Sequence, residues 1–292
     1  MFKRNALGLN SAVERVAAKI TAVRQQNIIG KADAYYEQGE AEKARAEYQR
    51  IIHVAKRKKP RILPTYAFQR AGEFGYHSID LPKYKIAYFP IPKNACTSLK
   101  WLFYELIYGA PFDSQHPLGT IHKFFRGGTM LAHNPNYADR CKVVVIRDPI
   151  QRFISAYRNR ILYHQDVASL YAEKGLSEAP EINQFVDDLE FYMRRSRVTN
   201  HHFGLQSLYL TGDFSFFDKI YPIEQLGELV AFLSDTVGRP LELPRKQAGG
   251  PKVTLQDLSP ESFAKLLAFY DADYQFLGDY YSADHIKALY AA

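Results

Sequence analysis

The segment Ile91-Pro92-Lys93-Asn94-Ala95-Cys96-Thr97-Ser98-Leu99-Lys100 joins an apolar run to an amphipathic pattern. Residues 85–91 are apolar and β-prone enough for a buried strand, and apolar residues then recur at helical spacing from Leu99 to Ile107 until Gly109. A strand, a short loop and a helix N-terminus are therefore predicted. The free N–H groups of that N-terminus, the helix dipole and the Lys93 cation favour a phosphate or sulfate group. We expect this group to be bound by Lys93, Asn94, Ala95, Cys96, Thr97 and Ser98.

A second strand and helix of the same design follow about fifty residues later, which suits a parallel strand that returns after a crossover. Residues 142–146 are a continuous apolar run that ends in Arg147-Asp148-Pro149. Pro149 suits a first helical position. The helix predicted to continue over residues 151–160 has an apolar stripe of Phe153, Ile154, Tyr157 and Ile161. Because ligands of open α/β sheets bind at the carboxyl ends of strands, we expect Arg147 and Ser155 to face the first site.

At these residues the chain resembles a known enzyme family. Pro92-Lys93-x-x-x-Thr97-Ser98-Leu99 is similar to the 5′-phosphosulfate loop of carbohydrate sulfotransferases of the Golgi-type family 2, which use 3′-phosphoadenosine-5′-phosphosulfate (PAPS). The second segment, Arg147-Asp148-Pro149 with Arg152, Ser155, Ala156 and Tyr157, is similar to the 3′-phosphate motif of the same family. Three later segments resemble further motifs of the family and follow one another in the same order. They are Asn200-His201-His202 with Gln206, Phe217-Asp218-Lys219-Ile220 with Glu224, and residues 270–277. The resemblance extends from Tyr84 to Tyr280.

The resemblance implies an α/β fold with a P-loop-like central parallel sheet flanked by helices. It also implies transfer of a sulfuryl group from PAPS to a hydroxyl of a carbohydrate or glycoconjugate, with release of 3′,5′-ADP. In such a transfer Lys93 would stabilise the departing phosphate oxygen. Arg147 and Ser155 would bind the 3′-phosphate. Transfer from PAPS should proceed without a metal, and no metal site is predicted.

The acceptor hydroxyl needs a base, and His122 is the first candidate because it lies between the two phosphate motifs. His116, His202 and Glu105 remain open as rivals. The adjacent pair at residues 201–202 does not indicate a metal site, since adjacent residues do not share one helix face and no carboxylate or cysteine lies nearby.

Residues 244–252 are basic, contain glycines and are bounded by prolines. Such a loop could close backbone amides, Lys246 and Lys252 over the donor, or it could be a plain surface connection.

Composition agrees with this interpretation without selecting it. The 292 residues are 47% hydrophobic and carry a formal net charge of +7, which permits a large core and suits any polyanionic partner. We expect a carbohydrate or glycoconjugate acceptor and no nucleic-acid partner. No apolar run approaches the roughly 18 residues of a membrane span, so a soluble, cytoplasmic protein is expected, with a peripheral membrane contact left open. Cys96 and Cys141 are too few for a disulfide framework and are expected to be reduced.

The N-terminal part has a different character. Apolar and small residues are spaced like one helix-turn-helix repeat of the tetratricopeptide type at Ala32, Tyr36, Gly39, Ala44, Tyr48 and Ile52. We expect a helical region with this hairpin over residues 1–60, a linker over 61–83 and the main domain over 84–292. A lone repeat must bury its apolar face against a neighbour, so the hairpin would dock on the chain itself, mediate oligomerisation or bind a partner.

Two other classes of function stay open. Residues 143–148 mimic the strand and carboxylate that hold magnesium in P-loop kinases, but no glycine occurs between Tyr84 and Tyr108 to build a Walker loop. The second alternative is a glycan- or partner-binding protein on an inactive transferase fold. The presence of both Lys93 and Arg147 argues against it.

Overall fold

The computed structural model describes residues 76–113, 115, 120–125, 129–130, 139–176, 178–210, 214–244 and 251–292, with scattered positions between 31 and 47. The chain divides into two compact units, Met1–Gly75 and Tyr76–Ala292. Residues 76–81, which the sequence assigned to the linker, form two strands of the second unit.

In the first unit, helical positions lie on both sides of a turn at Gln38. Lys31 on one side and Glu47 on the other form an ion pair of 2.9 Å. The residues that carry the tetratricopeptide-like pattern, and the basic run at 56–61, lie outside the described residues. That pattern therefore stays a prediction.

The second unit is built on a four-stranded sheet with the order β2-β3-β5-β6. Its strands are β2 (Ile79–Leu81), β3 (Ile86–Phe89), β5 (Cys141–Ile146) and β6 (Lys219–Pro222). The predicted parallel pairing of the two motif strands is confirmed, since β3 lies parallel to β5, and β5 to β6. The edge strand β2 is antiparallel to β3 instead. The short connection through Pro82–Tyr84 explains this difference, because a parallel neighbour would need a long crossover.

Two helices cover one face of this sheet. Helices α4 (Cys96–Tyr108) and α11 (Leu226–Val237) contribute Leu99, Leu102, Phe103, Leu229 and Leu233 to a cluster with alternate strand residues, including Ile86, Tyr88, Val143 and Val145. Gly109 ends α4, as the sequence predicted, and its backbone is left-handed. Ile107, which the sequence placed on the apolar stripe, is 38% exposed in the last turn, where the helix extends past the sheet cluster.

The helix that follows β5 begins as predicted and then changes character. Asp148 is the N-cap of α6 (Pro149–Ala156): its side chain accepts from the Gln151 N–H, and Pro149 takes the first turn. The predicted single helix is wrong beyond Ala156, because residues Tyr157–Tyr163 form a π-helix. π-Helical segments are rare and occur frequently at functional sites.

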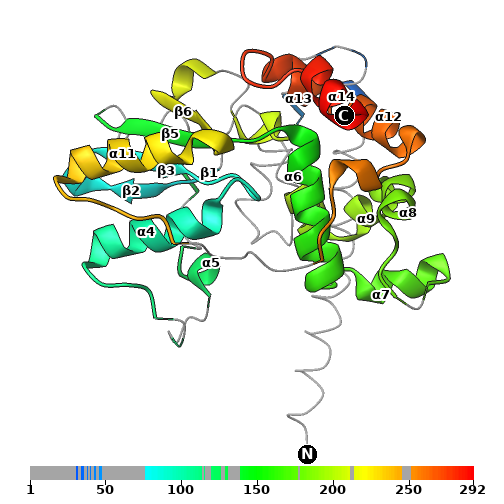
Figure 1. Cartoon of the computed structure of the whole chain (residues 1–292), viewed down its shortest axis with the longest axis horizontal. Helices are drawn as coiled ribbons and strands as arrows, with labels where there is room; N and C mark the ends of the chain where they lie inside the picture. The colour runs from blue at the N-terminus through cyan, green and yellow to red at the C-terminus, as the bar shows by residue number, and fades with distance from the viewer. Residues whose placement is uncertain are drawn as a thin grey trace, which may run out of the picture. The chain divides into compact units, whose positions relative to one another are not determined.

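Most of the remaining helices form a layer beside the sheet, and α6 stands between the two parts in Figure 1. The helices of this layer are α7 (Ala168–Tyr171), α8 (Ile182–Asp187), α9 (Leu189–Arg195), α10 (Arg197–Phe203), α12 (Pro260–Phe269), α13 (Asp271–Phe276) and α14 (Ala283–Ala291). The short helix α5 (Ile121–Phe124) lies instead next to α4. Short 3-10 turns occur at Pro82–Tyr84, Ala172–Lys174, Ser207–Tyr209, Phe214–Phe216, Ile223–Gln225 and Leu255–Asp257. Strands β1 (Tyr76–His77) and β4 (Thr129–Met130) pair separately.

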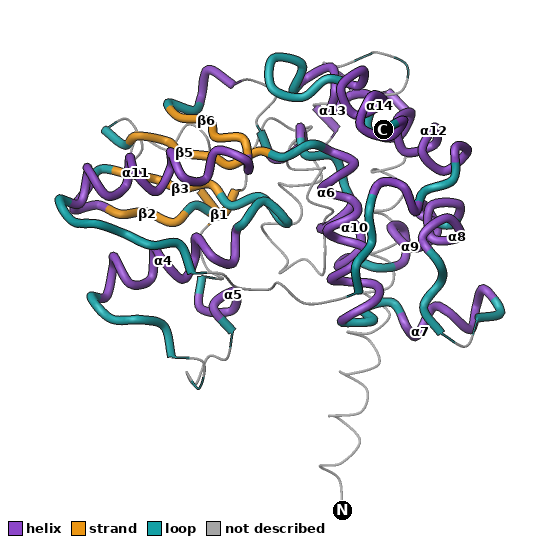
Figure 2. Tube along the Cα trace, in the orientation of Figure 1, coloured by secondary structure: helices purple, strands orange, loops and turns teal. Residues whose placement is uncertain are grey.

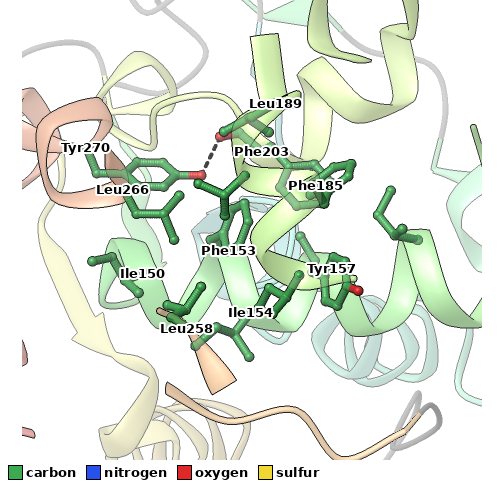
Figure 3. Packing of buried hydrophobic residues seen from close by; sticks show 14 of the residues in the cluster. Ile150, Phe153, Ile154, Tyr157, Phe185, Leu189, Phe203, Leu258, Leu266 and Tyr270 are labelled. Atoms are coloured by element: carbon green, nitrogen blue, oxygen red, sulfur yellow. Dashed lines mark hydrogen bonds between the residues drawn. The ribbon is translucent and has the colours of Figure 1, made fainter. Parts of the chain in front are cut away.

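The predicted apolar stripe, which begins in α6 and continues into the π-helix, is buried in this helical layer. Phe153 lies at the centre of Figure 3, with Phe185, Phe203 and Tyr270 around it, and Figure 2 shows α10 running beside α6. The Tyr270 hydroxyl donates to the Phe203 carbonyl at 2.7 Å. We call the buried rings Phe153, Tyr157, Phe185, Tyr192, Phe203 and Tyr270 the aromatic core. Ser259 is the N-cap of α12, and its hydroxyl oxygen accepts from the Ser262 N–H.

Within the described residues, no helix is both long and apolar enough to cross a bilayer. Cys96 and Cys141 are free thiols.

Candidate functional site

The loop that joins β3 to α4 is held in a costly backbone conformation. Lys93 and Ala95 have positive φ angles of 71° and 55°, each of which costs a non-glycine residue about 1–2 kcal/mol. Such turns point successive N–H groups into a concave anion site. Ala95 is also the N-cap of α4 and has no side-chain oxygen to cap the helix. We call residues 92–98 the anion cradle.

Asn94 anchors the anion cradle to the sheet. Its side chain is completely buried and its Nδ2 donates to the Val145 carbonyl at 2.9 Å and to Gln206 Oε1. The Asn94 backbone N–H donates to the Ile91 carbonyl. Asn94 was predicted to contact the bound anion. In the structure its side-chain amide group donates to protein groups instead, so that the side chain holds the loop in place.

Arg147 brings the two strand-to-helix motifs together. Its Nη1 donates to the Lys93 carbonyl at 3.1 Å, so the ends of β3 and β5 meet at one site. Gln206 fixes the Arg147 backbone, accepting from its N–H at 3.1 Å and donating to its carbonyl at 2.7 Å. Asp273 in turn accepts from the Gln206 N–H at 2.7 Å. The residue that follows β5 is therefore held through α13 as well as through the sheet.

Lys93 is mostly buried among other cations. Its Nζ donates to Asn159 Oδ1 at 2.9 Å, a contact that the π-helix provides. Burial is the main cause that lowers the pKa of Lys93 to about 8, with Cys96 opposing the shift and Arg160, Arg147 and Arg158 adding to it. A group of mutually repelling cations is stabilised when an anion is bound among them.

His122 in α5 lies against the anion cradle. Its Nε2 is 2.9 Å from Thr97 Oγ1, and its Nδ1 is 3.3 Å from Lys100 Nζ. Burial, followed by the charges of Lys100 and Arg160, lowers the pKa of His122 to about 4. The imidazole is therefore neutral near pH 7.

His202 is a second neutral histidine near the site. Its Nδ1 is buried without a hydrogen-bond partner in the described part of the chain. Burial and the neighbouring His201 hold the pKa of His202 well below its usual range, and Lys93 contributes to that shift. Arg152, which is completely buried, donates to the His202 and Gly204 carbonyls and so positions this turn. Arg152 therefore supports the site instead of facing solvent as helix arginines usually do.

Of the other predicted site residues, some lie in the described ranges and some lie outside them. Ser155 is half-buried in the second turn of α6, and Lys252 is exposed. Arg158 of the π-helix donates to the Pro251 carbonyl at 2.7 Å, which brings the residue before Lys252 to the helix that holds Asn159. Lys246 and the rival base His116 lie outside the described residues.

Three residues at this site were missed or given no role from the sequence: Lys100, Asn159 and Gln206. Lys100 is the last residue of the quoted segment, two positions after the anion cradle, and from the sequence it is an ordinary helix cation. The position of Asn159 between Arg158 and Arg160 was the available signal, but its orientation depends on the π-turn. Gln206 belongs to a resembling block, and its role became visible only from its contacts with Asn94 and Arg147.

The set of side chains fits a polyanionic nucleotide donor such as PAPS. Lys93, Lys100 and Arg147 are largely buried, and none forms an ion pair with a carboxylate in the ranges described. A buried charge without a partner is costly, so an anion of the substrate would supply the missing counter-charge. No cluster of three or more histidine, cysteine or carboxylate side chains that could hold a metal occurs among the described residues.

Comparison with known proteins identifies a family for this chain. A family model described as the sulfotransferase family matches residues 76–282, which is more than half of the chain. The match begins at the first residue of the second unit and includes every described residue of the site. No curated protein matches the chain, and no solved structure does.

Proposed function

Because the chain belongs to the sulfotransferase family, we propose that it transfers a sulfuryl group from PAPS to a hydroxyl of a carbohydrate or glycoconjugate and releases 3′,5′-ADP. The observation that supports this most directly is the 3.1 Å bond from Arg147 Nη1 to the Lys93 carbonyl. It puts two cationic strand-to-helix sites side by side, as a donor with both a 3′-phosphate and a 5′-phosphosulfate requires.

The residues divide the work of the transfer between them. PAPS supplies a sulfuryl group on a good leaving phosphate. The acceptor oxygen forms a bond to sulfur while the bond from sulfur to the 5′-phosphate oxygen breaks, and the acceptor proton passes to a base. Lys93, next to the cradle N–H groups, stabilises the negative charge that grows on the departing oxygen. Arg147 forms a charged pair with the 3′-phosphate, and Ser155 adds a hydroxyl.

His122 is the proposed base, with His202 as its rival. Both are neutral near pH 7 because burial and nearby cations lower the pKa of each. Binding of a polyanionic donor neutralises those cations, which raises the basicity of either imidazole when it is needed. Donor binding would thus prepare the base.

Kinase chemistry is disfavoured by the contacts of Asp148. This carboxylate follows β5, where P-loop kinases hold magnesium, but Oδ1 accepts from the Gln151 N–H at 2.9 Å and Oδ2 from the Tyr274 hydroxyl at 3.0 Å. Burial also raises the pKa of Asp148. Both oxygens are therefore used to start α6 and to fix α13.

A binding protein on an inactive fold is the other alternative. Such a protein has no need to keep Lys93 and Lys100 buried without an acidic partner, since that arrangement costs stability and serves an anion. The carbohydrate acceptor and the cytoplasmic location remain parts of the proposal that rest on the sequence, as does a role of the N-terminal hairpin in docking on the chain, oligomerisation or partner binding.

The test has two arms. Calorimetry should show that the unmodified protein binds 3′,5′-ADP much more tightly than 5′-AMP, because Arg147 recognises the 3′-phosphate. Incubation with radiolabelled PAPS and a panel of cell-envelope glycans should move label to a glycan, with or without a metal chelator. Equal affinity for the two nucleotides, or phosphorylation from ATP with magnesium, would overturn the proposal.

A further inference from the structure

Lys100 is a buried cation that the proposed chemistry has not yet used. It lies in the second turn of α4, three residues after Thr97 and therefore on the same helix face. It is only 7% exposed, and burial lowers its pKa. In the described ranges its ammonium has no carboxylate partner, and its one side-chain contact there is His122 Nδ1 at 3.3 Å.

This contact fixes the protons of His122. A lysine ammonium has three donors and no acceptor, so Nδ1 must accept from it. The neutral ring then carries its proton on Nε2 and donates to Thr97 Oγ1, 2.9 Å away. In this state His122 has no free lone pair with which to take a proton from an acceptor hydroxyl.

The contact also indicates where the Lys100 ammonium would act. A base must lie within hydrogen-bond reach of the attacking hydroxyl, and that hydroxyl must lie against the sulfur atom. A cation in contact with the base is therefore closer to the sulfuryl group than to the 3′-phosphate, which is assigned to Arg147. Lys93 and Lys100 would flank the phosphosulfate from the loop and from the helix, respectively.

We propose that Lys100 is a second donor-binding cation. When PAPS binds, the Lys100 ammonium donates to a sulfonate oxygen instead of His122 Nδ1, and Nδ1 is then free to accept the proton of the acceptor hydroxyl. This inference rests on the proposed function and deepens it. Binding of the sulfonate and availability of the base become one event, so that an enzyme without its donor has a blocked base.

The decisive variant is Lys100→Met, which keeps the length and the burial of the side chain but removes the charge. It should weaken binding of PAPS by about 10- to 100-fold, the usual value of a hydrogen bond to a charged group. Binding of 3′,5′-ADP, which lacks the sulfonate, should change by less than about threefold on the same scale. Calorimetry with each nucleotide, without acceptor, measures both. Lys265→Met on the exposed surface of α12 is the matched control and should change neither affinity.

A second measurement reports on His122 directly. Nitrogen NMR of the imidazole should show a proton on Nε2 in the free protein and in the 3′,5′-ADP complex. The signal of Nδ1 should change when PAPS binds. If Lys100→Met fails to fold, Lys100→Gln and these spectra of the unmodified protein still test the inference.

The outcomes separate two kinds of failure. If the unmodified protein does not prefer 3′,5′-ADP to 5′-AMP, the proposed function itself is wrong. If the unmodified protein does prefer 3′,5′-ADP, but Lys100→Met weakens the binding of PAPS and of 3′,5′-ADP equally, or of neither, only the role of Lys100 is wrong. An unchanged Nδ1 signal on PAPS binding would have the same meaning.

Discussion

The anion cradle and the aromatic core lie at opposite extremes of local order. In the aromatic core, Phe153, Phe185 and Phe203 are 0% exposed, and the ring centroids of Phe185 and Phe203 are 5.0 Å apart. In the anion cradle, Lys93 and Ala95 have left-handed backbones, and the buried Asn94 Oδ1 has no partner in the described part of the chain. One region contributes stability while the other consumes it.

Helix α6 connects these regions and shows how the fold supports the site. It starts at Asp148, next to Arg147, and its middle residue Phe153 belongs to the aromatic core. Arg152 extends this connection, because it is buried beside the core and bonds the His202 carbonyl. The strained site is therefore held in place by a well-packed neighbour. Changes in the two regions should have opposite signatures.

Phe153→Ala should have the largest effect, and on stability alone. Truncating a buried phenylalanine leaves a cavity and usually costs about 3–5 kcal/mol. Urea unfolding should show this loss in the free energy of unfolding. The surviving folded protein should still bind 3′,5′-ADP at low temperature. The exposed aromatic control Tyr163→Ala should cost less than about 0.5 kcal/mol. A Phe153 variant that is as stable as the unmodified protein would contradict the assignment of the core.

Lys93→Ala should have the converse signature. Removing one group that stabilises charge in the transition state usually lowers turnover by about 10²–10³-fold. Binding of 3′,5′-ADP should remain largely intact. The free energy of unfolding should not fall, because a buried cation without a carboxylate partner is itself destabilising and the substitution removes it. Turnover with PAPS, calorimetry and thermal unfolding measure the three quantities. Turnover within about threefold of the unmodified enzyme would remove Lys93 from the chemistry.

Arg147→Ala should act on nucleotide affinity. The loss of a hydrogen-bonded charged pair is worth about 1.5–3 kcal/mol, or about 10- to 100-fold in the dissociation constant. The loss should be confined to 3′,5′-ADP, since 5′-AMP has no 3′-phosphate. Calorimetry with both nucleotides provides its own control. An equal loss for both would mean that Arg147 only holds the Lys93 carbonyl in place.

The low pKa of Lys93 gives a smaller effect that can be measured without destroying the site. Burial lowers this pKa to about 8, so raising the pH through that value removes the ammonium that the reaction needs. The value of kcat/KM should therefore be level below about pH 8 and fall by about tenfold per pH unit above it. Lys93→Arg, if active, should move the alkaline limb upward, because a guanidinium keeps its proton. A flat profile to about pH 9.5 would contradict the role of the ammonium.

Sequence patterns predicted most of what is local. The strand at 142–146, the helix start at Pro149, the helix end at Gly109 and the burial of the stripe from Phe153 to Ile161 follow from periodicity and capping, and each is confirmed. The parallel pairing of the motif strands followed from their spacing.

What the sequence could not give depends on contacts between distant residues. The π-turn that points Asn159 at Lys93 leaves no periodic signal, because the same apolar residues would suit an ordinary helix. The contacts of Gln206 span 59 and 112 residues along the chain. His122 was chosen for its place between the motifs, but its engagement by Lys100 and Thr97 depends on how α5 lies against α4.

The two ends of α4 allow the smallest and most specific test of the difference between strained and relaxed regions. Gly109 and Ala95 both have left-handed backbones, with φ angles of 73° and 55°, but only the residue at the cradle end has a side chain. Ala95→Gly relieves about 1–2 kcal/mol of strain in the folded state. The glycine also makes the unfolded chain more flexible, which lowers stability by about 0.4–1 kcal/mol. The free energy of unfolding should therefore rise by the difference, about 0.5–1 kcal/mol. Binding of PAPS should weaken slightly, since a freer loop must be ordered around the donor. Urea unfolding and calorimetry measure the two changes, and Gly109→Ala is the control that should only destabilise. If Ala95→Gly lowered stability instead, the cradle would not be strained, and its contrast with the core would lie in charge alone.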